Sequence, residues 1–134
     1  MTTFPNRIFA VLASIFLPVA EDCWKMKKVL TLSDVDGSSK LLLAKVLVQK
    51  HILPHVMCNP EEGEGVEINV WDVDTASEHM LVLKFWTSSK CFVFVKNWAN
   101  DFVRRDLEEK DQIGLRWDDE NSCLEFTLLK KKRT

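Results

Sequence analysis

The chain has 134 residues, of which 46% are hydrophobic and 28% charged, and its formal net charge at pH 7 is −2. These values exclude an intrinsically disordered chain and are typical of one globular domain that buries a core without disulfides or metals. The overall acidity does not favour nucleic-acid binding, but the distribution of charge is more informative. Residues 24–50 carry six lysines against two aspartates, and residues 84–105 carry five basic residues against one aspartate. If folding brings these blocks together, the molecule has one cationic face and an acidic back.

The N-terminal segment RIFAVLASIFLPVAED has two interpretations. Its single basic residue, its apolar run and the small Ala20 before an acidic pair fit a signal peptide. Its apolar residues also recur at helical spacing, which predicts a helix that packs on the domain; these are Ile8, Val11, Leu12, Ile15 and Val19. The run is too short to span a membrane. The residues alone leave both interpretations open.

The first half of the remaining chain predicts three strands and one helix. Strands are expected at 26–33 and 40–46, joined by the turn DVDGSS. Lys25, Lys27 and Lys28 are interpreted as a solvated strand edge. A short helix near 47–53 must end before Pro54, and the segment 66–74 alternates as a half-buried strand does.

The second half predicts four more strands and a second helix. The apolar runs 79–86 and 91–96 suit central strands, and Asn97 is a candidate cap for a helix in NWANDFVRRDL. Trp98 and Phe102, four residues apart in this helix, are expected in the core. Strands 112–117 and 123–129 flank the turn DDENS. We therefore expect a mostly β fold: a seven-stranded open (pseudo) β-barrel with two short α-helices, plus the N-terminal helix.

The turn in KFWTSSKCFVFVKNW is unusual for a hairpin. A tight turn favours Asn-Gly or Asp-Gly because its central residues need positive φ, whereas this turn carries Thr87, Ser88 and Ser89 before Lys90. Either the hydroxyls and lysines have a function, or the segment is a solvated loop.

Patterns of catalysis and metal binding are weak. Four cysteines without a C-x-x-C pair argue against zinc, and His51 and His55 have Pro54 between them and no evident third ligand. The acidic clusters lie in loops, and no nucleophile elbow or phosphate-binding glycine loop is present. We expect no enzymatic activity, no metal, no cofactor and no small-molecule substrate.

The motifs, taken in order, resemble the plant B3 DNA-binding domain. The segments that carry the resemblance are VLTLSDV (29–35), KLLLAK (40–45), VEINVWDVD (66–74), KFWTSSKCFVFVKNW (84–98), DFVRRDL (101–107) and KDQIGLRW (110–117). Each motif is weak alone, but the order and spacing together are specific. The resemblance implies a barrel over residues 24–130, preceded by an N-terminal apolar helix at 1–23 and followed by a basic tail at 131–134.

The resemblance also implies how DNA would be bound. In this family two arms clamp the major groove, and here they correspond to Asp36–Lys40, the first arm, and Trp86–Lys90, the second arm. Their hydroxyls and lysines would supply phosphate contacts and hydrogen bonds to base edges. The candidate DNA-binding residues are Gly37, Ser38, Ser39, Lys40, Lys45, Lys84, Trp86, Thr87, Ser88, Ser89, Lys90 and Lys96.

Three positions in the two arms depart from the family pattern, and Lys110 replaces a glycine outside them. Gly37 replaces a lysine, Lys40 replaces an arginine and so removes a bidentate fork, and Thr87 replaces the asparagine suited to adenine. We expect a nuclear transcription regulator that binds double-stranded DNA, with retained N-terminal residues and reduced cysteines. The alternative is a B3-like scaffold with weakened DNA readout that acts as a protein-interaction or dimerisation module, with the N-terminal helix as a candidate surface for a homo- or heterodimer. A secreted, disulfide-bonded domain is the third possibility.

Overall fold

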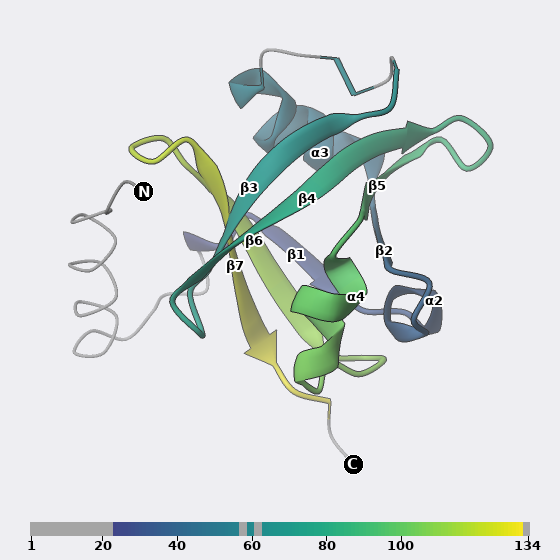
Figure 1. The fold of residues 1–134 in the computed structure, drawn as a ribbon, viewed down its shortest axis with the longest axis vertical. Helices are drawn as coiled ribbons and strands as arrows, with labels where there is room; N and C mark the ends of the chain where they lie inside the picture. The colour runs from purple at the N-terminus through teal and green to yellow at the C-terminus, as the bar shows by residue number, and fades with distance from the viewer. Residues whose placement is uncertain (1–22, 57–58, 61–62, 133–134) are drawn as a thin grey trace.

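The computed structural model describes residues 23–56, 59–60 and 63–132. Seven strands form one sheet in the order β1-β6-β7-β3-β4-β5-β2, which curls into an open barrel (Figure 1). The strands are β1 (Met26–Val29), β2 (Lys40–Leu43), β3 (Val66–Asp72), β4 (Ser77–Trp86), β5 (Cys91–Val95), β6 (Gln112–Asp118) and β7 (Cys123–Lys130). This confirms the expected mostly β, seven-stranded barrel. The predicted N-terminal helix lies outside the described residues, and among the described residues no helix is long and apolar enough to cross a membrane.

Alternation along the strands produces the core. In β3, Ile68 and Val70 are buried while Glu67 and Asn69, which alternate with them, are exposed, as expected for a strand with one face turned inward. The core contains aromatic rings from three separate elements: Phe92 and Phe94 of β5, Trp98 and Phe102 of the 97–107 segment, and Phe126 of β7. The burial of Trp98 and Phe102 was predicted.

The boundaries of the first two strands were predicted wrongly. β1 ends at Val29 and is followed by the helical turn α2 (Leu32–Val35), because the Asp34 carboxylate accepts the backbone N–H of Thr31 at 2.8 Å. β2 ends at Leu43, and α3 (Lys45–His51) begins where the strand was expected to continue. The 3₁₀ turn η2 (Leu53–His55) follows it and contains Pro54. The second predicted helix is divided into α4 (Trp98–Asp101) and the 3₁₀ turn η3 (Val103–Arg105).

Asp34 and Lys28 hold together the two ends of the sheet. β1 and β2 are the terminal strands of the sheet order and do not pair with each other. Buried Asp34 accepts the backbone N–H of Leu42 in β2 at 3.1 Å, and the Lys28 ammonium lies 3.0 Å from the same carboxylate and donates to the Leu42 carbonyl. The interpretation of Lys28 as a solvated lysine was therefore wrong, since its side chain bridges the opening of the barrel.

The α4 segment joins this seam to the middle of the sheet. The indole N–H of Trp98 donates to the Asp34 carbonyl at 2.7 Å, and the Asn97 side chain donates to the Met80 carbonyl in β4 at 3.0 Å. Asn97 has φ of 65°, a left-handed conformation that asparagine tolerates better than most residues. The segment fixes the base of the first arm relative to β4.

Candidate nucleic-acid interface

The register of β2, β5 and β4 gathers candidate residues on one face of the sheet. Lys40 is paired with Val95, Lys84 with Val93 and Trp86 with Cys91. Paired residues share a face, and the alternate residues Leu41, Leu83, Phe92 and Phe94 point into the core. Lys40, Lys84 and Trp86 therefore project from the outer face of the sheet.

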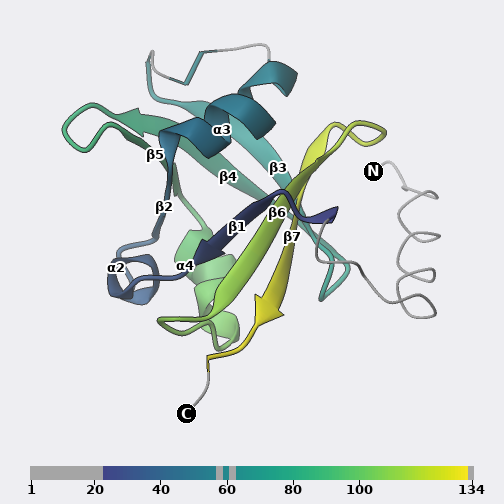
Figure 2. The same cartoon turned by 180° about the vertical axis from the view of Figure 1, so that it is seen from behind.

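The two arms lie at opposite ends of β5 and on the same side of the molecule. The segment after α2 leads into β2 beside the Val95 end of β5, and the β4–β5 turn adjoins the Cys91 end. Both views of the ribbon place α2 and this turn along one edge, with β2 and β5 between them (Figures 1 and 2). The arms flank a strip of sheet instead of facing away from each other.

The first arm uses its polar atoms partly for its own structure. The Ser38 backbone N–H donates to the Asp36 carboxylate at 2.9 Å, and its hydroxyl donates to the Ser33 carbonyl at 3.3 Å. Hydrogen bonds from Ser38 hold the pKa of Asp36 below its usual value. The Ser39 hydroxyl accepts the backbone N–H of Ala99 at 3.0 Å, and Gly37 adopts φ of 92°. The sequence did not predict these bonds, which leave the Ser39 proton freer than that of Ser38.

The second arm is more open. Thr87, Ser88, Ser89 and Lys90 are all exposed. A hollow of about 500 Å³ at its base is lined by Lys84, Phe85, Trp86, Thr87 and Ser88. Lys90 adopts φ of 53°, which is uncommon for a residue other than glycine and places strain in a turn that could have used Asn-Gly.

Cations of the first arm and of α3 contact the aromatic residues of β4. The Lys40 ammonium lies 5.8 Å from the centre of the Trp86 ring. Lys45, expected on a strand, is the first residue of α3, and its ammonium lies 5.3 Å from the Phe85 ring centre. These are cation–π distances, and they orient both lysines without neutralising them.

The lysines of this surface are not paired with carboxylates of the described chain. In residues 23–56, 59–60 and 63–132, the ion pairs involve other basic residues, namely Lys28, His55, His79, Arg105, Arg116, Lys131 and Lys132. Lys40, Lys84, Lys90 and Lys96 therefore retain their charge for an external anion. Lys96, with φ of 63°, is exposed just beyond β5.

A serine–histidine–aspartate series was missed in the sequence. The Ser77 hydroxyl lies 2.7 Å from His79 Nε2, and His79 Nδ1 lies 3.0 Å from the Asp101 carboxylate. Ser77 and His79 are two apart on one face of β4, which was the only signal available. The series links β4 to α4, and none of the hollows described in this section contains it. No cluster of three or more potential metal ligands occurs among the described residues.

Comparisons with known proteins agree with this geometry. Residues 24–129 match the family model "B3 domain-containing protein At5g26805, C-terminal domain". The putative B3 domain-containing protein At1g78640 of Arabidopsis thaliana is 40% identical over 114 residues, which are 79% of this chain and 22% of that protein. The chain spans about a fifth to a third of the length of the first curated relatives it matches.

Two solved structures share the fold. The Arabidopsis FUS3–DNA complex superposes with a TM-score of 0.64 at 21% identity, covering 80% of this chain and 97% of that one. The Arabidopsis thaliana transcription factor LEC2–DNA complex gives 0.63 at 18% identity, covering 79% and 92%. With the family model matching from Trp24 to Leu129 and the barrel shared with both structures, the chain belongs to the B3 domain family.

Proposed function

We propose that this domain binds double-stranded DNA in the major groove, in the nucleus, as a non-enzymatic part of a transcription regulator. The observation that carries the proposal is that two hydroxyl-rich arms lie on one side of the barrel, each ending in a lysine, Lys40 or Lys90, that forms no ion pair within the described chain. The fold is shared with proteins whose structures are DNA complexes, which supports the same class of ligand here.

The proposed roles differ between the arms. Lys90, Ser88 and Thr87 are exposed at the tip of the second arm, where they can reach base edges. Lys84 and Lys96 flank the strip of sheet between the arms and suit phosphates. Lys40, held beside Trp86, reaches the groove from the first arm. Trp86 is half-buried, and a base-paired duplex offers it no unstacked ring, so its role is to support the arm.

Selection from a random duplex library at two salt concentrations tests the proposal. We expect a preferred sequence that persists at the higher salt, since base contacts survive screening better than phosphate contacts alone. The variant Lys90→Ala should lose the preferred sequence, whereas Lys50→Ala on α3 is the matched control. If no duplex binds more tightly than a polyanion such as heparin, the proposal is wrong.

A second candidate function is protein interaction on a scaffold with weakened DNA readout. It is favoured by exposed apolar side chains, with exposed fractions of 54% for Val29, 63% for Leu32 and 71% for Val46. A dimer through residues 1–23 is one form of it. Sedimentation of the full chain and of a chain beginning at Trp24 distinguishes this form, because equal association states rule out a dimer mediated by that segment.

A further inference from the structure

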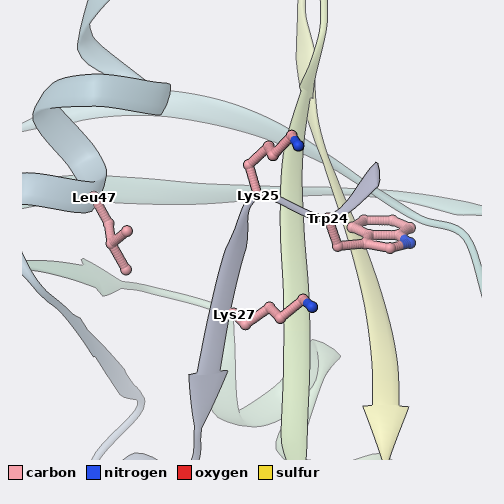
Figure 3. Close-up of a pocket in the computed structure, with 4 residues that line it drawn as sticks. All are labelled: Trp24, Lys25, Lys27 and Leu47. Carbon is pink, nitrogen blue, oxygen red and sulfur yellow. The ribbon is translucent and has the colours of Figure 1, made fainter. Parts of the chain in front are cut away.

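A basic groove lies between β1 and α3, behind the arms. One hollow of about 370 Å³ is lined by Trp24, Lys25, Lys27 and Leu47. In Figure 3 the two lysines extend from β1 over β6, and Leu47 lies on the other side of β1, on α3. A second hollow of about 230 Å³ shares Lys25 and is also lined by Lys50 and His51 of α3. We call these two hollows together the β1–α3 groove.

The charged side chains that line the groove are basic, and two of them, His55 and Arg116 of the second hollow, are paired with Asp119 and Glu125. The described residues lining the two hollows include no aspartate or glutamate. Lys25, Lys27 and Lys50 take part in no ion pair of the described chain. Desolvation, and then the charges of Lys50 and Lys25, hold the pKa of His51 below its ordinary value. The groove therefore favours an anionic ligand.

The backbone of β1 is unpaired on the side facing the groove. Within the part of the chain that the structure describes, β1 pairs only with β6. The backbone of Leu30 exchanges hydrogen bonds with Asp111 and Lys110, both at 2.8 Å, just beyond β6. In an antiparallel ladder alternate residues bond to the same neighbour, so Lys28 and Leu30 bond toward β6 while Lys27 and Val29 present their N–H and C=O groups outward. This edge faces β2 across the opening that the Lys28 side chain bridges. Lys28 extends from the same face of β1 as buried Met26 and Leu30, so the outward groups of Lys27 and Val29 are still a template for another strand.

Apolar side chains adjoin this edge. Val29 of β1 is more than half exposed, and Leu47 of α3 lines the groove itself. A polypeptide strand beside β1 would place one set of alternate side chains next to Lys25 and Lys27 and the other set toward Leu47. This pattern matches a segment in which acidic and apolar residues alternate. A duplex is too wide to pair with a strand edge.

We propose that the β1–α3 groove docks an extended segment of a partner protein, with alternating acidic and apolar residues, which adds to the free edge of β1 as an extra strand. The groove lies on the β1–β6 side of the barrel, and the arms lie along the edge formed by β2, β5 and β4 (Figure 2). Such a partner would be bound while DNA occupies the arms.

Two peptides of one composition test the proposal on the full chain. The first is acetyl-Asp-Val-Glu-Val-Asp-Val-Glu-amide, and the second is acetyl-Asp-Glu-Asp-Glu-Val-Val-Val-amide. We expect the alternating peptide to bind about tenfold more tightly by fluorescence anisotropy and to slow hydrogen exchange at the amides of Lys27 and Val29. Equal binding of the two peptides, or protection only elsewhere, would overturn the proposal.

Matched variants separate this site from the arms. Lys25→Glu with Lys27→Glu should weaken peptide binding by about tenfold or more, whereas Lys84→Glu with Lys90→Glu should leave it unchanged. Val29→Pro removes one outward N–H without changing charge, and it should also weaken the peptide while thermal unfolding verifies that the fold is retained. If the Lys25/Lys27 variant instead weakens a short duplex as much as the Lys84/Lys90 variant and spares the peptide, the groove belongs to the nucleic-acid surface and the proposal fails.

Discussion

At the residue scale, Asp34 has the clearest structural role. It is buried, and its carboxylate binds the Thr31 and Leu42 backbone N–H groups as well as Lys28. Asp34→Ala would leave these donors without an acceptor, and we expect a loss of about 3–5 kcal/mol in the free energy of unfolding, measured by urea denaturation. Lys28→Met, which removes the cation and keeps an apolar stem, should cost less. Equal stability of Asp34→Ala and the parent chain would contradict this role.

The arm lysines give a second prediction at this scale. Lys40→Ala and Lys90→Ala should each weaken binding of the selected duplex by about 1–3 kcal/mol if they contact bases. Binding measured to the preferred duplex and to single-base variants distinguishes the two roles of a lysine. Relaxed specificity indicates a base contact, and uniform weakening indicates a phosphate contact. No effect of Lys90→Ala on any duplex would remove the second arm from the interface.

Single residues also show which features could be predicted from the sequence and which could not. Exposed lysines in a turn and aromatic residues at helical spacing were visible in it, so Lys90 and Trp98 were placed correctly in a turn and in the core. The hydrogen-bond partners of Lys28 and Ser38 could not be predicted from the sequence. Lys28 bonds to a carbonyl fourteen residues away, and Ser38 uses its hydroxyl inside its own loop. Such bonds depend on tertiary geometry, which a pattern of residue types does not contain.

At the scale of elements, the C-terminal end of β7 is fastened to the turn before β6. The buried Asp111 carboxylate accepts the Lys131 ammonium and the backbone N–H of Lys132, both at 2.7 Å, and the Glu108 N–H at 2.8 Å. Burial, the largest single effect, raises the pKa of Asp111, but these hydrogen bonds together outweigh it and hold the pKa below its ordinary value. Lys131 and Lys132 are thus hydrogen-bonded to the folded domain. The expected domain boundary, with a separate basic tail beginning at residue 131, stays a prediction.

This contact predicts a pH dependence of stability. A carboxyl group whose pKa is lower in the folded than in the unfolded state stabilises the fold fully at pH values above its unfolded-state pKa, which is about 4. This stabilisation is lost as the pH falls through the folded-state pKa. Asp111→Asn should lower the free energy of unfolding at pH 7 by about 1–2 kcal/mol and lose less stability than the parent chain between about pH 5 and pH 2. Asp72, whose pKa burial raises despite Arg105, acts in the opposite sense but is common to both chains. Parallel stability curves would contradict the assignment.

The second arm can be tested as an element. Replacing Thr87–Lys90 by Asn-Gly creates a tight hairpin that the antiparallel β4–β5 pair accommodates. We expect unfolding stability to be retained or increased, because the strained Lys90 is removed, and duplex binding to fall to the level of the polyanion control. An unchanged preferred duplex would show that the arm does not read bases. The existence of the strands and their order along the chain were predictable from alternation and from apolar runs, whereas the ends of β1 and β2 depended on the Asp34 bonds.

At the scale of the whole molecule, the sequence showed that basic and acidic residues are segregated along the chain. It did not show that the basic residues would be divided between two surfaces of the barrel. The two basic blocks do meet across β2, β5 and β4, but part of the first block, Lys25, Lys27 and Lys50, lines the β1–α3 groove instead. Counting charges along the chain cannot separate the lysines of the β2–β5–β4 surface from those of the β1–α3 groove. The reason is that β1 and β2 are neighbours in sequence but lie at opposite ends of the sheet order. The barrel therefore has two cationic surfaces where one was expected.

The division of charge predicts a shallow salt dependence of DNA binding. Among the described lysines, the proposed interface uses Lys40, Lys84, Lys90 and Lys96. The log–log slope of affinity against salt is about 0.9 per phosphate neutralised, so we expect a slope of at most about 3–4. The variant Lys40→Arg with Thr87→Asn, which restores two family residues, should tighten binding through bidentate contacts without steepening the slope, since it adds no charge. Gly37→Lys would add a charge but must adopt φ near 92°, so its gain is offset by backbone strain. Fluorescence anisotropy between 50 and 200 mM salt measures the salt dependence of DNA binding for the parent chain and for both variants. A slope well above 4 for the parent chain would mean that the lysines of the β1–α3 groove also contact DNA.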